Sequence, residues 1–262
     1  MTTTTGLLVP HRFRGPASSG NGGWSAGALA ALLPHDQDRD DDHCVSWPAI
    51  TVALRQPPPL DVLMPVTEDP DGTLVASYDG RPVAQARLTD RDLEPVPPVS
   101  ADEARAAEAS YPGLISHPFP TCFACGTERE EGDGLRIFPG EVSPDGGAVR
   151  TAATWTPHPS LAEDWHDYRD DVRHASLPVT WAALDCVGGW AGDLTERLMV
   201  LGTMTARIDT LPVIGEEHVV MGTARSREGR KTTTASTLYD ADGRVVAVAE
   251  HVWIAIDPAA FA

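Results

Sequence analysis

The architecture follows from one segment, LPVTWAALDCVGGW at residues 177–190. Its residues predict a helix that is apolar on most faces, with Asp185 as its only charge. A helix of this kind has to be covered on most sides, so we expect a sheet to wrap around it. A carboxylate in such a helix needs a bonding partner or a function, because an unpaired buried charge is costly.

Strand patterns surround this helix. Shorter strands are expected at 135–138 and 148–155, on either side of the turn Asp145-Gly146-Gly147. Glu228-Gly229 and Asp242-Gly243 supply further turns. The segment at 244–254 is long for a strand, so it is predicted to be central. The longer strands after the helix are predicted at 200–208, 218–226, 231–239 and 245–256.

The first half of the chain repeats this order of elements, which indicates two similar units. Gly20-Asn21-Gly22-Gly23-Trp24 precedes an Ala/Leu-rich segment at 25–33, predicted to be a short buried helix. Asp79-Gly80 is a strong hairpin signal. Residues 81–86 are the predicted counterpart of the long last strand. Strands are expected at 49–54, 73–78 and 82–88.

The strand pattern stops in a proline-rich stretch that contains a short predicted helix at 101–109. We therefore predict an N-terminal unit at 7–92, a linker at 93–116 and a C-terminal unit at 117–257. Strands and helices are grouped rather than alternating, so the fold class is α+β with antiparallel sheets.

Composition excludes several classes of protein. The formal net charge is −18, which argues against a nucleic-acid partner and against an anionic membrane surface. No apolar run reaches the roughly 18–20 residues that span a bilayer, and the N-terminal residues do not have a signal-peptide pattern. Four cysteines are too few for a disulfide scaffold, so a cytoplasmic location is expected. Lys231 is the only lysine, which makes Schiff-base chemistry a weak candidate.

Three short motifs resemble hotdog-fold thioesterases of the phenylacetyl-CoA and 4-hydroxybenzoyl-CoA type. Asn21-Gly22-Gly23 is similar to their His-Gly-Gly helix start. Asp185, with Gly189 four positions later, is similar to the acidic residue and glycine of their central helix. Cys122-Phe123-Ala124-Cys125-Gly126, with the stretch at 132–137, resembles the opening strand of some thioesterase-like hotdog proteins. The resemblance implies a double hotdog, in which two antiparallel sheets each wrap around one central helix and join into a pseudo-dimer.

Each half holds only one part of the family's site. The first half has Ala30 and Ala31 where the acidic residue would fall, and the second has Ser176-Leu177-Pro178 in place of His-Gly-Gly. In the family the two parts come from different subunits, so fusion implies one composite site between the halves. We expect the sheets to join edge to edge, with both helices on the concave side. The Gly22-Gly23 turn should then lie within about 15 Å of Asp185.

The expected chemistry is hydrolysis of an acyl thioester. Backbone N–H groups of Gly22 and Gly23 at a helix start would polarise a carbonyl oxygen, and Asp185 would act as general base or nucleophile. Asn21 replaces the family's histidine, which leaves the role of that side chain open. The alternatives are an ordinary tight turn at Gly22-Gly23 and a carboxylate bonded to a backbone or Arg partner at Asp185.

Trp24, Trp181 and Gly189 are the predicted substrate-binding residues near the helices. Arg136 and Arg173 are candidates for a CoA phosphate, as are Arg12 and Arg14; surface salt bridging is the competing interpretation. The predicted partner is an acyl-CoA or acyl-carrier substrate, with no nucleic acid and no membrane, and a homodimer is compatible with the sequence.

Cys122-x-x-Cys125 suggests zinc, but a structural zinc needs four ligands. Cys44 and Cys186 are isolated in the sequence and His117 lies five residues before Cys122, so a structural role is favoured over zinc or a redox dithiol. No metal and no cofactor are predicted.

Two loops have compositions that suggest a functional role, one as a lid and one as a calcium-binding loop. The polar segment at 156–174, with His158, His166 and His174, is a candidate lid. The acidic loop at 36–42 is expected to be solvated, because it does not have the ligand spacing of a calcium loop.

Two other functions stay open. A biosynthetic tailoring enzyme of the dehydratase, hydratase or cyclase kind would use the same fold for another reaction. A non-catalytic acyl-ligand binding protein would explain the loss of half of each site.

Overall fold

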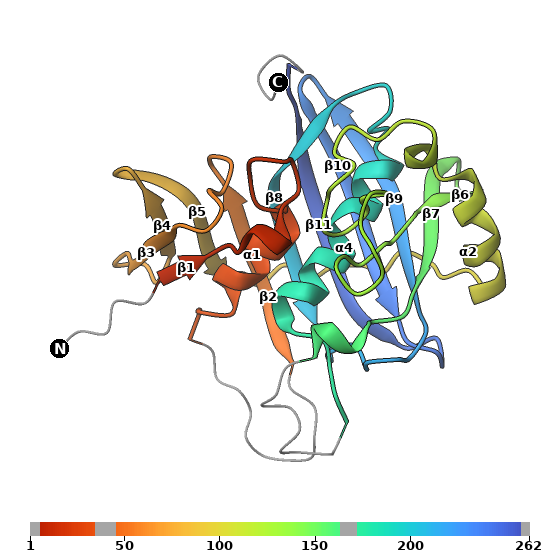
Figure 1. The fold of residues 1–262 in the computed structure, drawn as a ribbon, viewed down its shortest axis with the longest axis horizontal. Coiled ribbons are helices and arrows are strands. Elements are labelled where there is room, and N and C mark those ends of the chain that lie inside the picture. Colours follow the sequence, from red (N-terminus) through yellow and green to blue (C-terminus); the bar gives the residue numbers. More distant parts are fainter. Residues whose placement is uncertain (1–5, 35–45, 163–171, 258–262) are drawn as a thin grey trace.

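A computed structural model describes residues 6–34, 46–162 and 172–257, and the sheet that they form is continuous (Figure 1). Eleven strands pair antiparallel along its whole width, as the α+β prediction requires. From edge to edge they are β1 (Gly6–Leu8), β3 (Leu63–Glu68), β4 (Leu74–Tyr78), β5 (Arg81–Leu88), β2 (Trp47–Leu54), β8 (Met199–Ile208), β11 (Val245–Ala255), β10 (Lys231–Tyr239), β9 (His218–Glu228), β7 (Ala148–Trp155) and β6 (Gly140–Asp145).

The two halves of the chain meet at the pair β2–β8. Thr51 lies opposite Thr205 in this pair, and their hydroxyl oxygens are 2.9 Å apart. The predicted edge-to-edge junction is therefore confirmed. The order of strands is symmetrical about it, because β5 follows β2 on one side and β11 follows β8 on the other. This confirms that β5 and the central strand β11 are counterparts.

Helices α1 (Gly22–Ala30) and α4 (Leu177–Ala191) lie on one face of the sheet and pack against each other (Figure 1). Their close approach depends on Gly23 and Gly27, one turn apart on α1. A Cβ atom at Gly23 would lie 2.6 Å from the Asp185 Cβ, and one at Gly27 would lie 2.7 Å from the Trp181 Cβ. Glycine at both positions lets the two backbones approach to a distance that other residues would prevent.

The strands hold α4 by hydrogen bonds as well as by apolar packing. Every residue of α4 except Pro178 is buried, as its apolar sequence predicts. The hydroxyl of Thr151 on β7 donates to the carbonyl of Val187, and that of Ser236 on β10 donates to the carbonyl of Leu184. These bonds fix the rotation of α4 about its axis, and so fix the direction of the Asp185 side chain.

The predicted linker at 93–116 is an ordered part of the C-terminal half. Helix α2 (Ala101–Ala107) packs on the opposite face of the sheet from α4, where Ala104 and Val96 share a small core with Met221. The chain then passes through the 3-10 turns η2 (Glu108–Ser110) and η3 (Pro112–Leu114) to the α4 side. Tyr111 packs there against Trp190 of α4.

Several predicted elements differ from the observed ones. Residues 135–138 form no strand. Arg136 has a φ of 56°, which interrupts extended backbone, and the N–H of Leu135 donates to the carbonyl of Phe123. The strand that precedes β7 and pairs with it is β6, and β9 pairs with its other edge. Strands β1 and β3, at one edge of the sheet, were not predicted. The acidic loop at 36–42 lies outside the described residues. In the described part of the candidate lid, the one helical element is the 3-10 turn η4 (Pro159–Leu161).

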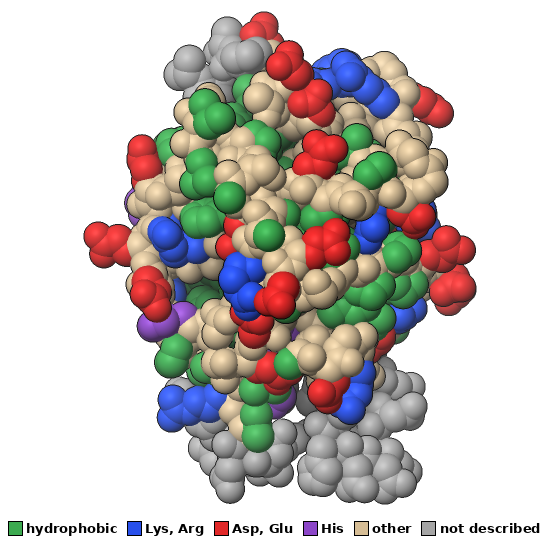
Figure 2. Space-filling view, turned by 90° about the vertical axis from the view of Figure 1, so that its right-hand side faces the viewer, with side chains coloured by type: hydrophobic (Ala, Val, Ile, Leu, Met, Phe, Trp, Pro, Cys, Tyr) green, Lys and Arg blue, Asp and Glu red, His purple; other side chains and the backbone are tan. Residues whose placement is uncertain are grey.

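The surface agrees with the acidic composition. On the face shown in Figure 2, at the α2 side, Asp and Glu side chains are spread widely and the described Lys and Arg side chains stand between them. Arg105 on α2, for example, forms ion pairs with Asp102 and Glu217. This face therefore does not gather basic side chains in the way that a phosphate backbone requires.

Candidate functional site

A cavity of about 640 Å³ opens beside the contact between α1 and α4. It is mostly apolar, with a few polar groups, which is the usual character of a small-molecule site. Asp185, Asn21 and Gly22 lie at its wall. Its apolar lining comes from both halves of the sheet and from two loops: Leu54, Pro57, Pro58, Phe119, Leu194, Met199, Leu201, Trp253, Ile254 and Ile256.

Asp185 is held by two hydrogen bonds from the first half of the chain. Its Oδ2 accepts the Asn21 Nδ2 at 2.9 Å and the Gly23 backbone N–H at 2.9 Å. The N-terminus of α1 therefore points at the one carboxylate of α4, and its partial positive charge stabilises that carboxylate. The predicted juxtaposition of the glycine turn and Asp185 is confirmed.

The second oxygen of Asp185, Oδ1, differs from Oδ2 in its hydrogen bonding. Oδ1 is buried and has no hydrogen-bond partner among the described residues. Burial raises the pKa of Asp185 to about 7, the nearby Cys122 adds to the increase, and the bonds from Gly23 and Asn21 oppose it. Oδ1 is thus a buried acceptor whose hydrogen-bonding capacity no described residue satisfies.

Asn21 has two functions at once. Its Oδ1 accepts the N–H of Trp24 at 2.8 Å and so caps α1, while its Nδ2 donates to Asp185. The two partners fix the orientation of the amide, because one is a donor and the other an acceptor. Asn21 therefore links the start of α1 to the carboxylate, at the position where the resembling family has histidine.

The glycine turn differs in one respect from the expectation. Gly22 and Gly23 were both predicted to offer N–H groups to an oxyanion, but the Gly23 N–H is taken by Asp185. The Gly22 N–H makes no hydrogen bond to any described residue, and Gly22 lines the cavity. One backbone donor, rather than two, is available to a carbonyl oxygen.

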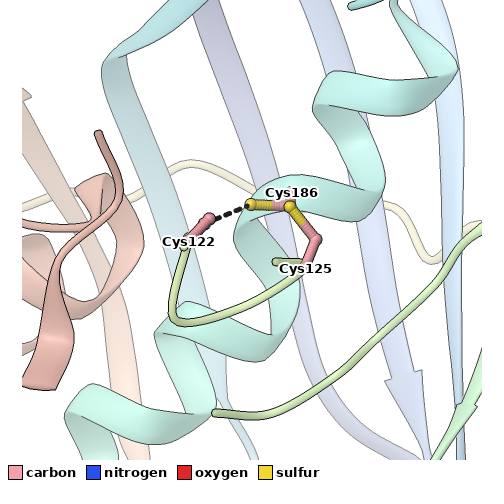
Figure 3. A group of neighbouring side chains, drawn as sticks. All are labelled: Cys122, Cys125 and Cys186. Atoms are coloured by element: carbon pink, nitrogen blue, oxygen red, sulfur yellow. Dashed lines mark hydrogen bonds between the residues drawn. The ribbon is translucent and has the colours of Figure 1, made fainter. Parts of the chain in front are cut away.

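Three thiols converge at helix α4 (Figure 3), where Cys186 directly follows Asp185 in the chain. Cys122 and Cys125 come from the loop before β6 and Cys186 from α4, and their sulfur atoms all lie within 4.8 Å of one another. Hydrogen bonds from the other two thiols lower the pKa of Cys122, while the pKa values of Cys125 and Cys186 are raised. The sequence does not show this cluster, because Cys186 lies far along the chain from Cys125 and has no second cysteine near it.

His117 also lines the cavity and was not predicted as a site residue. Its Nδ1 accepts the N–H of Phe119 at 2.9 Å, which places the ring proton on Nε2. Nε2 lies 3.1 Å from the Cys125 carbonyl oxygen and 3.3 Å from the Cys125 Sγ. His117 is therefore a donor to Cys125, and its only signal in the sequence is its position before the Cys-x-x-Cys motif.

The predicted substrate-binding residues near the helices support the fold instead of lining the cavity. Trp24 stacks on Phe13 with ring centroids 4.1 Å apart. Trp181 is fully buried against Gly27. Gly189 lies under Trp253, and it is Trp253 that reaches the cavity.

The predicted phosphate-binding arginines do not line the cavity either. Arg136 donates to the carbonyl of Arg129, and Arg12 donates to the backbone of Gly132. Arg14 donates to the His11 carbonyl, and Arg173 is exposed near the C-terminal end of the candidate lid. The arginine that does line the cavity is Arg55, at the end of β2, whose Nε donates to Gln85.

The described histidines of the candidate lid do not reach Asp185. His174 faces the Leu211 carbonyl oxygen at 2.9 Å, His158 accepts the N–H of Ser160, and His166 lies outside the described residues.

The comparison with solved structures supports the fold. No protein-family model matches the chain, and no curated protein matches it. Among solved structures, a conserved protein of unknown function with hot dog fold from Alicyclobacillus acidocaldarius is 14% identical, with a TM-score of 0.55 over 92% of this chain and 89% of that chain.

Two further solved structures are similar over nearly the whole chain. The tesB protein of Mycobacterium avium subspecies paratuberculosis is 10% identical, with a TM-score of 0.57 over 92% of this chain and 89% of that one. The acyl-CoA thioesterase II TesB2 of Mycobacterium marinum is 10% identical, with a TM-score of 0.53 over 90% and 91%. The chain has the hotdog fold that the resemblance implied. None of the helices described here is long and apolar enough to cross a membrane.

Proposed function

We propose that this protein is a double hotdog enzyme that hydrolyses an acyl thioester at a composite site between its two halves. The observation that carries the proposal is the pair of hydrogen bonds from Asn21 and Gly23 to Asp185 at the wall of the cavity. One half supplies the donors and the other supplies the carboxylate. The similarity to thioesterases of the same fold supports the reaction class.

The geometry supports Asp185 as a general base. Asn21 and Gly23 hold Oδ2, so Oδ1 would take a proton from a water molecule as the water oxygen attacks the thioester carbonyl carbon. The Gly22 N–H would stabilise the negative charge on the carbonyl oxygen. When the tetrahedral intermediate breaks its C–S bond, the departing sulfur takes the proton back from Asp185, and the products are an acid and a thiol.

The cavity has an apolar part and a charged residue, which suit the two ends of such a substrate. Leu201, Trp253 and Ile254 give it an apolar part that suits an acyl chain. Arg55 is exposed and is the only Lys or Arg among the described residues that line the cavity, so it would meet a phosphate of the carrier. We therefore favour an acyl-CoA or an acyl-phosphopantetheine substrate.

The cavity favours hydrolysis over a dehydratase that pairs histidine with a carboxylate. His117 is the one histidine among the described lining residues, and its Nε2 faces Cys125 rather than Asp185. The three free thiols are also consistent with a reducing compartment such as the cytoplasm.

Release of free thiol from a panel of acyl-CoA and acyl-pantetheine substrates tests the proposal. We expect turnover of at least one chain-length class by the unmodified protein and by Asp90→Asn, which changes an exposed carboxylate outside the cavity. Tight binding of acyl-CoA without any thiol release would contradict hydrolysis and would favour an acyl-binding protein.

A further inference from the structure

The three thiols beside Asp185 have the spacing of ligands around one metal ion. With Zn–S bonds of about 2.3 Å, two thiolates on a tetrahedral zinc lie roughly 3.8 Å apart. The sulfur atoms of Cys122 and Cys186 are 3.7 Å apart, and the Cys125 sulfur lies within 4.8 Å of both (Figure 3). All three side chains are buried, and the cysteines are free.

The surroundings supply hydrogen-bond donors to sulfur. The Asn21 Nδ2 lies 3.7 Å from the Cys122 sulfur. His117 presents its Nε2 proton 3.3 Å from the Cys125 sulfur. Thiolates on a metal carry negative charge in a buried place, and donors of this kind stabilise that charge.

We propose that Cys122, Cys125 and Cys186 bind one Zn²⁺ ion, with His117 as a hydrogen-bond donor outside the ligand set. Thiolate sulfur selects zinc over the hard cations. Binding displaces the thiol protons to solvent. All three cysteines line the cavity, so the fourth position of the ion is open to a water molecule from it.

The site would join two separate parts of the chain. Cys122 and Cys125 belong to the loop that covers α4, and Cys186 belongs to α4 itself, directly after Asp185. A zinc ion would therefore fix this loop against the helix and keep the cavity wall in place beside Asp185. The inference does not depend on the proposed hydrolysis, because its measurements need no turnover.

The test uses the full chain, purified under reducing conditions without chelator, in a Cys44→Ser background so that the three cluster thiols are the only ones. Zinc content is measured by mass spectrometry, and Co²⁺ replacement reports thiolate ligation through its charge-transfer absorption. X-ray absorption at the zinc edge counts the sulfur neighbours. We expect one zinc ion per chain with three sulfur neighbours at about 2.3 Å.

Serine variants identify the ligands. Cys122→Ser, Cys125→Ser and Cys186→Ser should each lose the zinc and the cobalt absorption, whereas Thr127→Ser in the same loop and His117→Gln should keep both. If a cysteine variant fails to fold, the absorption measurements on the intact cluster decide the matter. Several results would overturn the proposal: no uptake of zinc, fewer than three sulfur neighbours, zinc retained by Cys186→Ser, zinc lost in His117→Gln, or a disulfide within the cluster and no metal.

Discussion

The Asp185 carboxylate accepts the backbone N–H of Gly23 at 2.9 Å, although the two residues are 162 positions apart in the chain. This bond joins the start of α1 to the middle of α4, and it crosses from one half of the molecule to the other. It exists because glycine at position 23 brings the α1 backbone close to α4. The helix contact and the candidate site therefore depend on the same atoms.

Gly23→Ala is expected to impair both stability and activity. The added Cβ would lie 2.6 Å from the Asp185 Cβ and 2.7 Å from the Trp181 carbonyl oxygen, so the helices must separate. Overpacking of this kind costs roughly 1–3 kcal/mol of unfolding free energy, measured by urea denaturation. Gly27→Ala is the matched control, because it crowds Trp181 but not Asp185. Equal activity per folded molecule in the two variants would contradict a role for the Gly23 bond.

Substitutions of Asn21 should separate the helix cap from the carboxylate contact. Asn21→Ser keeps an oxygen that can accept the Trp24 N–H, whereas Asn21→Ala removes it and should cost about 1 kcal/mol more in stability. Both remove the amide Nδ2 that donates to Asp185, and loss of a hydrogen bond to a charged group corresponds to a fall in kcat of roughly 10- to 100-fold. If Asn21→Ser retained full activity, the contact would be structural only.

Arg55→Gln should raise KM for an acyl-CoA and leave kcat nearly unchanged, because Arg55 lines the cavity far from the reacting carbonyl in the proposed arrangement. An effect on the order of tenfold is expected at low salt, and it should shrink as ionic strength rises. Arg87→Gln, an exposed change on β5 outside the cavity lining, should have no effect. An unchanged KM would remove Arg55 from carrier binding.

His251 makes the stability of the fold dependent on pH. Burial lowers its pKa to about 4, and Thr234 and Gly188, which contact its ring, are uncharged. An unfolded histidine has a pKa of about 6.5, so its contribution to stability is complete above that pH and is lost as pH falls toward 4.

The expected loss is up to roughly 3 kcal/mol of unfolding free energy. Urea denaturation at several pH values between about 4.5 and 7 measures it, and His251→Gln should show a smaller dependence on pH than the unmodified protein. Parallel curves for the two proteins would show that His251 does not titrate in this way.

Much of the fold could be predicted because the signals are local. Residues 177–190 are apolar on most faces, and the helix they form is buried on nearly all of its surface. The Asp79-Gly80 and Asp242-Gly243 turns mark hairpins that the structure contains. The strand prediction at 135–138 was wrong because the backbone N–H groups of Leu135 and Ile137 bond to the loop at Phe123 and Ala124. The positive φ of Arg136 cannot be seen in an apolar pattern.

The candidate site could be predicted only where a motif was present. Asn21, Gly23 and Asp185 were found through resemblance, and the structure brings them together. Cys186, His117 and Arg55 reach the cavity through tertiary packing. The predicted Arg136 has instead a backbone partner, which only the path of the chain reveals.

The most direct test of the account is the kcat of Asp185→Asn on the best acyl thioester, measured by thiol release. Asparagine has the size of aspartate but cannot take a proton, so we expect kcat to fall by about 10²- to 10⁴-fold while the fold and the binding of acyl-CoA persist. Asp90→Asn should retain full activity. A kcat for Asp185→Asn equal to that of the unmodified protein would contradict the assignment of Asp185 as the base.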